Sequence, residues 1–198
     1  MKRMIKAAVT AAGSLGVIGT VLTAGAAPAL AAPMNTAYGA AAVGILNLAP
    51  VAVATPMNTA AVASNANLGG LLATGVIQDR ADYRGATSQL SQGIVLTLPR
   101  QGKLTATGLR SWCVRTGPFT FGAANIYSGA ILQVGQATIT LPVSPPANDV
   151  LSLPNGVTIT LNKQVRVAGV LTVTAIQAQL PGQLVKLGVS SCAGRMVD

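Results

Sequence analysis

An alternation of apolar and polar residues between positions 150 and 192 constrains the fold more than any other feature of the chain. Residues 157–161 alternate Val, Ile and Leu with Thr, which gives an extended segment one buried face and one wetter face. A second run, residues 170–180, is rich in β-branched residues, and a third, residues 185–192, alternates again and ends on a cysteine. Pro154-Asn155-Gly156 is a turn, because Pro fixes φ and Asn-Gly tolerates positive φ. We therefore predict three strands joined by turns that contain Gly or Asn.

The rest of the chain repeats turn signals about every 8–12 residues, which is the spacing of a β-sandwich or barrel. No sustained period of about 3.6 residues occurs beyond the N-terminal segment. We predict an all-β fold, a single antiparallel β-sandwich or barrel-like domain. Residues 78–92 are the most polar stretch of the chain, and Gly108 is a candidate site for a bulge. Further strands are expected at residues 94–98, 103–114, 126–132 and 136–141.

The N-terminus has the composition of a secretory signal. A basic start, residues 1–6, precedes an Ala/Gly/Val/Leu run and the small-residue motif Ala29-Leu30-Ala31. We expect cleavage between Ala31 and Ala32, which leaves residues 32–198 as one secreted all-β domain with no integral membrane span. The alternative is a retained, uncleaved anchor, which the glycines of the run and Pro28 disfavour.

The two cysteines, Cys113 and Cys192, both lie in the exported part. In an oxidising compartment the expected outcome is one disulfide, and the alternative is two buried free thiols. The bond would close a loop of about 80 residues, which the chain-entropy treatment equates with roughly 4–5 kcal/mol of stability. Because no C-x-x-C motif is present, we expect a structural bond and not a catalytic one.

The acid–base and metal-binding inventory is small. The chain has no His and no Glu, which excludes catalytic histidines and histidine metal sites, and we expect neither a metal nor a cofactor. The runner-up to a non-catalytic protein is a secreted hydrolase that uses Asp79 or Asp149 as its acid or base. The simpler interpretation places the segment 79–84 in a surface loop with exposed ion pairs. The carboxylates available to an enzyme are Asp79, Asp82, Asp149 and Asp198.

Basic residues outnumber acidic ones, with 13 Lys and Arg against 4 Asp and no Glu. Loss of residues 1–31 would remove three of the basic residues and none of the acidic ones. Aromatic residues are 3% of the chain, too few for a base-stacking surface, so nucleic acid is not an expected partner. We expect a partner among anionic cell-wall polymers or other envelope surfaces, reached by diffuse electrostatics, or a charge that serves only solubility. The oligomeric state stays open.

Several short motifs, in this order and spacing, resemble the choice-of-anchor P family of exported bacterial proteins. They are Ala37-Tyr38-Gly39-Ala40, Pro50, Cys113, the run 157–161 with Asn162-Lys163-Gln164, Val173-Thr174-Ala175-Ile176 and Gly188-Val189-Ser190-Ser191-Cys192. The resemblance implies an exported β-rich ectodomain without an established activity. Family members often carry a histidine at the position that Gln177 occupies. Since neither a sorting signal nor an apolar tail follows Cys192, we expect a released or peripherally held protein.

From these observations we expect a secreted, disulfide-bonded β-sandwich with a structural or binding role in the cell envelope or extracellular space. It would carry out no catalysis. The competing hypothesis is the Asp-dependent hydrolase described above. A deep pocket with Asp79 or Asp149 at its base would favour the enzyme, and a closed core with shallow surface grooves would favour the binding module.

Overall fold

The computed structural model describes residues 34–100, 102–127 and 130–194, which form fourteen strands and one short 3₁₀-helix. The expected signal segment 1–31, its cleavage site at Ala31 and Ala32, and Asp198 lie outside the described residues. The elements are β1 (Thr36–Gly44), β2 (Leu48–Val51), β3 (Ala60–Ala63), β4 (Asn67–Leu68), β5 (Leu72–Ala81), β6 (Gly85–Leu98), β7 (Gly102–Thr116), β8 (Phe119–Ile126), β9 (Ile131–Val134), β10 (Ala137–Thr140), β11 (Asp149–Ser152), η1 (Pro154–Gly156), β12 (Thr158–Val167), β13 (Val170–Leu180) and β14 (Gln183–Ala193).

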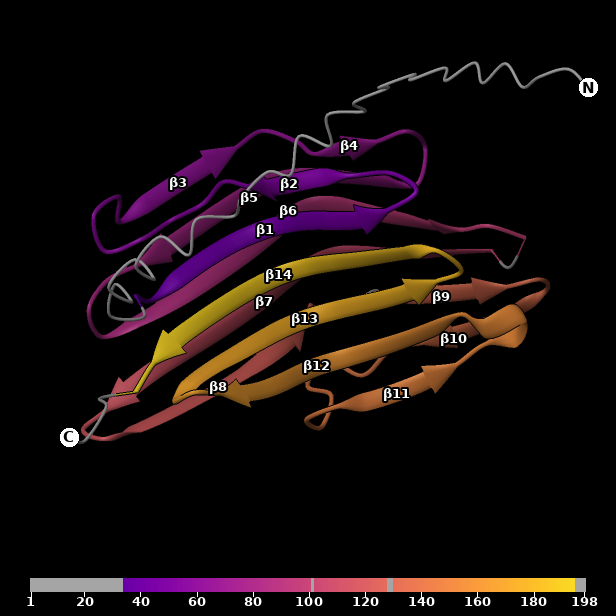
Figure 1. Cartoon of the computed structure of the whole chain (residues 1–198). Coiled ribbons are helices and arrows are strands. Elements are labelled where there is room, and N and C mark those ends of the chain that lie inside the picture. The colour runs from indigo at the N-terminus through magenta and orange to yellow at the C-terminus, as the bar shows by residue number, and fades with distance from the viewer. Residues whose placement is uncertain (1–33, 101, 128–129, 195–198) are drawn as a thin grey trace, which may run out of the picture. The chain divides into compact units, whose positions relative to one another are not determined.

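The strands form two antiparallel sheets that pack face to face (Figure 1). The front sheet of Figure 1 has the order β11-β12-β13-β14-β1-β2. The back sheet has the order β10-β9-β7-β6-β5-β3, and two further strands join it, β4 beside β5 and β8 beside β7. The predicted all-β fold is therefore confirmed, in the form of a sandwich.

The three predicted strands of the C-terminal segment are confirmed as β12, β13 and β14, which lie side by side. Ala168 and Gly169, both at positive φ, form the tight turn between β12 and β13. This backbone conformation matches the twist of the two strands and suits a two-residue hairpin. Pro154-Asn155-Gly156 is the expected turn, with Asn155 at φ 55°.

The interpretation of residues 79–84 as a surface loop is wrong for residues 79–81, which belong to β5. β5 continues to Ala81 and β6 begins at Gly85, so only residues 82–84 remain for the turn. Within residues 77–81 and 86–90 every second residue is buried, including the polar residues Asp79 and Ser88. The alternation typical of a strand is not apparent in the sequence here, because polar side chains occupy some of the inward positions.

Two further details of the back sheet differ from expectation. Residues 119–126 form β8, and the strand predicted over 126–132 is interrupted between Ile126 and β9. The bulge lies on β6, where Gln92 and Gly93 adopt positive φ, and not at Gly108 of the partner strand. Gly108 has a different role, since a Cβ there would lie 2.8 Å from the Tyr127 ring and 2.9 Å from the Leu90 carbonyl.

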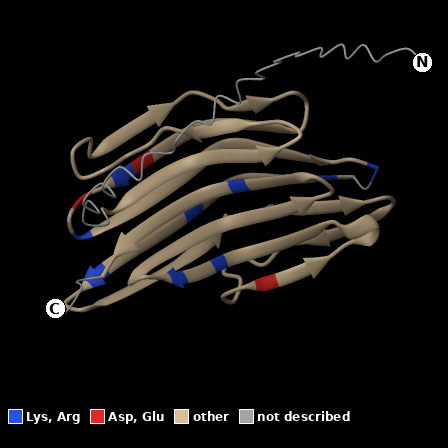
Figure 2. Cartoon of the chain, viewed as in Figure 1, with Lys and Arg blue, Asp and Glu red and all other residues tan. Residues whose placement is uncertain are grey.

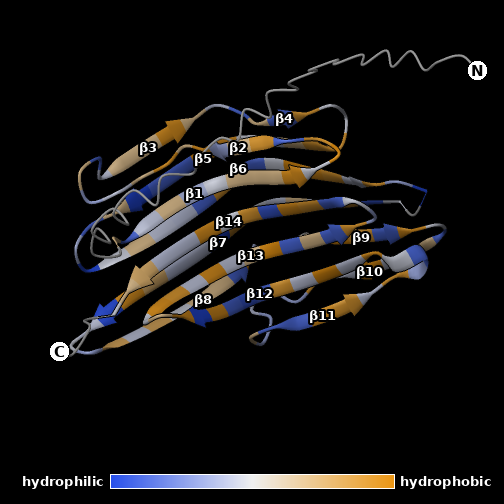
Figure 3. Cartoon of the chain, in the orientation of Figure 1, coloured by the Kyte–Doolittle hydropathy of each residue, from blue (hydrophilic) through white to orange (hydrophobic). Residues whose placement is uncertain are grey.

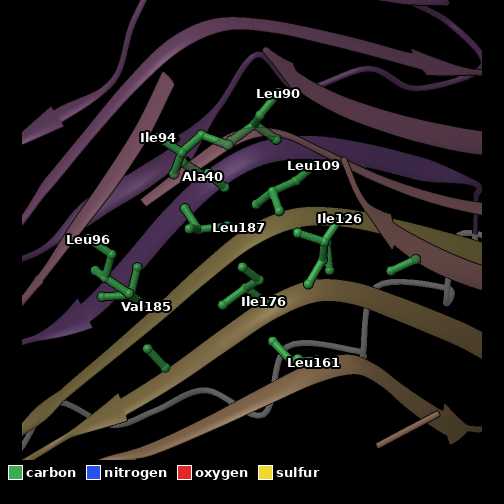
Figure 4. Packing of buried hydrophobic residues seen from close by; sticks show 14 of the residues in the cluster. Ala40, Leu90, Ile94, Leu96, Leu109, Ile126, Leu161, Ile176, Val185 and Leu187 are labelled. Carbon is green, nitrogen blue, oxygen red and sulfur yellow. The ribbon is translucent and has the colours of Figure 1, made fainter. Parts of the chain in front are cut away.

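The core is the layer of Leu, Ile, Val and Ala side chains between the sheets. Figure 4 shows Leu90, Ile94 and Leu109 of the back sheet facing Val185 and Leu187 of the front sheet. Hydrophobic and hydrophilic residues interleave along the strands of both layers, as an inward and an outward face require (Figure 3). Small residues let β1 approach the back sheet closely, as a Cβ at Gly39 would lie 2.1 Å from Ile77 Cγ2.

The two sheets are joined covalently where β7 faces β14. Cys113 and Cys192 form a disulfide across the core, with their Cα atoms 5.9 Å apart, so this predicted pairing is confirmed. Two residues earlier on each strand, the hydroxyls of Ser111 and Ser190 are 2.7 Å apart and fully buried. The small serine and cysteine side chains let the strands approach closely enough for both contacts.

Side-chain hydrogen bonds join the sheets a second time, between β12 and β8. Asn162, at φ 47° within β12, accepts the Ala124 N–H through Oδ1 at 2.9 Å and donates through Nδ2 to the Pro145 carbonyl at 3.0 Å. Arg166 donates to the hydroxyl and the carbonyl of Thr120. Buried polar groups are satisfied here, so the front and back sheets are held together by polar contacts as well as apolar ones.

We expect the disulfide to supply about 2–5 kcal/mol of the free energy of unfolding, because it restricts the unfolded chain over a separation of 79 residues. Denaturant unfolding of the wild type, with and without reductant, measures this difference. The variant Cys113→Ala/Cys192→Ala should match the reduced wild type to within about 1–2 kcal/mol. Peptide mass spectrometry of non-reduced protein should show the two cysteines linked; two alkylatable thiols would contradict the structure.

Candidate functional site

The structure does not bring the predicted acid residues together. Asp79 lies on β5 of the back sheet with its side chain in the core, whereas Asp149 begins β11 at the edge of the front sheet. Asp82 lies in the β5–β6 turn, and Asp198 is outside the described residues. The paired-carboxylate arrangement that a glycosidase-type hydrolase requires is therefore not formed by Asp79 and Asp149.

Asp79 belongs to a row of buried polar residues that runs across the back sheet. It pairs with Ser88 of β6, which pairs with Ser111 of β7, and Ser111 contacts Ser190 of the front sheet. Ser88 Oγ donates to the Tyr38 carbonyl at 3.1 Å. We call Asp79, Ser88, Ser111 and Ser190 the polar row. Sequence reasoning missed it, although Asp79 follows Ile77 by two residues, in phase with the buried face.

The carboxyl group of Asp79 is only 1% exposed, and neither of its oxygens has a hydrogen-bond partner of good geometry among the described residues. Burial raises its pKa to about 7, although the Ser88 hydroxyl and the N–H groups of Gly39 and Gln89 lie near enough to offset part of that rise. A carboxyl group sealed from solvent in this way has no route to a substrate. Its protonation state affects the stability of the fold.

A different cluster is open to solvent on the outer face of the back sheet. Arg80 of β5, Arg84 of the β5–β6 turn and Arg110 of β7 line one groove together with Trp112. The groove has a volume of about 520 Å³. We call it the arginine groove. Its basic residues are separated in the sequence, and only antiparallel pairing of β5, β6 and β7 brings them together.

The depth of the groove follows from side-chain size. Arg80 pairs with Thr87, and Thr87 pairs with Trp112, so a small residue on β6 separates two large ones on its neighbours. Gly85, two residues before Thr87, also lines the groove and adds no side chain. The floor is therefore β6 and the walls are β5 and β7. Adjacent strands are about 4.8 Å apart, which places the Cα atoms of Arg80 and Trp112 about 10 Å from each other.

The β5–β6 turn fixes Arg84 at one end of the arginine groove. Asp82 Oδ1 accepts the N–H groups of Arg84 and Gly85, at 2.7 and 2.9 Å. The Arg84 carbonyl accepts the Arg115 N–H at 2.7 Å, which ties the turn to β7. The Asp82 carboxylate is thus engaged with the backbone, and the expected exposed ion pairs of segment 79–84 are not formed in the described residues.

At the other end of the β5–β6 hairpin lies a more apolar groove of about 730 Å³, lined by residues such as Ile45, Leu71 and Leu180 with Arg100 at its edge. No group of three His, Cys, Asp or Glu side chains capable of holding a metal occurs in the described part of the chain. No helix in that part has the length and apolar character to cross a membrane.

Comparison of the chain with protein-family models, with curated proteins and with solved structures finds no match.

Asp79 should make stability depend on pH. Its folded-state pKa of about 7 exceeds the ordinary 3.8, so the folded state favours the protonated form. That contribution is complete below about pH 4 and is lost as the pH rises through 7, a change of up to about 4 kcal/mol in the free energy of unfolding. The chain has no His or Glu, so few other side chains titrate in this window.

Urea unfolding between pH 4 and pH 8 measures this effect. Asp79→Asn should remove most of the decrease and be more stable than the wild type at pH 8, because its side chain carries no charge to bury. The matched control Asp149→Asn, at a half-buried edge position, should keep the wild-type pH dependence. An Asp79→Asn variant with an unchanged pH dependence would show that another group is responsible.

Proposed function

We propose that this chain is a secreted binding module of the bacterial cell envelope that attaches to anionic polymers and carries out no catalysis. The observation that carries the proposal is the set of basic side chains on the outer faces of a rigid sandwich. Within the described residues these side chains form no ion pair with an acidic group. Figure 2 shows that basic positions occur on both sheets, and the whole chain has 13 Lys and Arg against 4 Asp. Unneutralised positive charge produces a field that attracts polyanions.

The disulfide supports the extracellular part of the proposal. Disulfides form and persist in oxidising compartments and are rare in the cytosol of most bacteria. The sandwich buries the Cys113–Cys192 bond beside the polar row, so it is part of the core and not an exposed redox pair. The signal-like N-terminus is the second, independent argument for export.

Membership of the choice-of-anchor P family is part of the same proposal. The motifs that carry the resemblance lie on or directly beside β1, β2, β7, β12, β13 and β14, and most of their residues are buried. Gly39 permits contact with Ile77, and Cys113 and Cys192 are the bonded pair. Proteins that share this sandwich architecture would share such motifs. The residues on their outer faces could still differ from one protein to another.

Envelope binding is tested by incubating the exported form with purified Gram-positive cell walls, with and without their anionic polymers. Exposed charges more than about 10 Å apart are screened at ~0.1 M salt, so retention should decrease over a salt series. Asp149→Asn should bind equally well or slightly better, because it removes a negative charge from the edge strand β11. Binding that ignores both salt and polymer content would contradict the proposal, as would any hydrolysis that Asp149→Asn abolishes.

Export is tested by N-terminal sequencing of the protein recovered from culture medium and cell-wall fractions. We expect the mature chain to begin at Ala32, since Ala29-Leu30-Ala31 has the small-residue pattern that signal peptidases cleave. Recovery of a chain that begins at Met1 from the membrane fraction would instead indicate a retained anchor.

A further inference from the structure

Three guanidinium groups converge on one groove although the chain has no matching acidic cluster there. Arg80, Arg84 and Arg110 are all exposed, and within the described residues their guanidinium groups have no hydrogen-bond or ion-pair partner. The one acidic residue that lines the groove, Asp82, directs Oδ1 to two backbone N–H groups. Three positive charges against one negative charge make this groove a local centre of positive potential.

Guanidinium groups favour a particular class of ligand. A planar fork of N–H donors matches the oxygens of phosphate and carboxylate in a bidentate manner, and Arg is more weakly hydrated than Lys. Arg110 and Trp112 are two residues apart on the same face of β7, so their Cα atoms are about 7 Å from each other. Arg80 lies on the opposite wall, beyond Thr87. A ligand in the groove can therefore meet cations on both walls.

The aromatic residues add a second feature. Trp112, the only tryptophan of the chain, lines the groove, and Tyr83 in the adjoining turn is 69% exposed. Along the same outer face, β8 carries Phe119 and Phe121, which are exposed and lie 6.4 Å apart between ring centroids. Exposed aromatic rings beside arginines provide flat apolar faces against which the C–H faces of sugar rings can pack. Trp, Tyr and Arg are also the residues most enriched at binding hot spots.

We propose that the arginine groove is the binding site for an anionic glycan, a polymer of sugar or polyol units that carries phosphate or carboxylate groups. Arg80, Arg84 and Arg110 would bind the anionic groups, and Trp112 would contact the carbon skeleton of the unit between them. This inference rests on the proposed function and deepens it, because it replaces diffuse attraction by a located site. An open groove of about 520 Å³ suits a linear chain that passes through it.

The local backbone supports a preformed site. The β5–β6 turn is held by Asp82, by the Asn35 amide, which donates to the Asp82 carbonyl at 2.6 Å, and by the Arg115 N–H. The floor strand β6 is paired on both sides along this region. A site whose backbone is already fixed loses less conformational entropy when a ligand binds.

Trp112 makes the test specific to the groove, since it is the only indole fluorophore of the chain. We would titrate the full mature chain with poly(glycerol phosphate) as the phosphate polymer and with polygalacturonate as the carboxylate polymer, and follow Trp112 emission. The expected result is a saturable change in emission with at least one polymer. The arm that saturates at lower concentration identifies the anionic group, and single-stranded DNA of equal charge serves as the comparison polyanion.

Two variants that remove the same number of positive charges distinguish binding in the arginine groove from diffuse electrostatic attraction. Arg80→Gln/Arg84→Gln/Arg110→Gln removes the arginines of the groove, and Lys103→Gln/Lys163→Gln/Lys186→Gln removes three charges that lie outside it. The groove variant should bind at least tenfold more weakly than the control variant at one salt concentration. Trp112→Leu, followed by calorimetry, should weaken glycan binding while its net charge and cell-wall salt dependence stay unchanged. Far-UV circular dichroism and the midpoint of urea unfolding verify that each variant is folded.

The outcomes distinguish this inference from the proposed function. If the two triple variants weaken polymer binding equally, the arginine groove is not the binding site, and the proposed diffuse binding to the envelope still stands. Absence of binding to cell walls and to both polymers would overturn both. Tighter binding of single-stranded DNA than of either glycan polymer would also overturn the inference, since it would assign the groove to nucleic acid.

Discussion

The close approach of β7 and β14 is the contact on which the rest of the structure depends. At this place Ser111 faces Ser190 and Cys113 is bonded to Cys192, so a hydrogen bond and a covalent bond occur two residues apart between the layers. Side chains larger than these would separate the sheets, and a separated pair could not form the disulfide. Because β7 is central in the back sheet and β14 in the front sheet, fixing this pair sets the position of each layer against the other.

The same close approach explains why the core tolerates a polar row. Ser88, Ser111 and Ser190 find partners in carbonyl or hydroxyl groups, so their burial has little net cost. Asp79 is the exception, since its carboxyl oxygens have no partner of good geometry in the described residues. Protonation reduces the cost of burying this carboxyl group, and burial accordingly raises its pKa to about 7.

The sequence predicted the fold class, the C-terminal strands and the disulfide because each has a local or compositional signal. The alternation predicted for residues 157–161 is present at the start of β12, where Ile159 and Leu161 are buried. Two cysteines allow a single intramolecular pairing. The parts of β5 and β6 that flank their connecting turn were not predicted, because Asp79 and Ser88 are polar residues at inward positions. Nor could the arginine groove be predicted. Arg80 and Arg110 are 30 positions apart in the numbering, and their proximity depends on the register of three strands.

The two faces of the β5–β6–β7 region therefore differ in the side chains that they carry. Inward positions of this region carry small hydroxyl side chains at Ser88 and Ser111, which bring the sheets together and fix the fold. Outward positions carry Arg80 and Trp112 as walls with Thr87 between them, which opens a groove without disturbing the inner packing. Because successive residues of a strand point to opposite faces, either set can change without the other. A surface of this kind can acquire or lose a ligand while the disulfide-bonded sandwich beneath it remains the same.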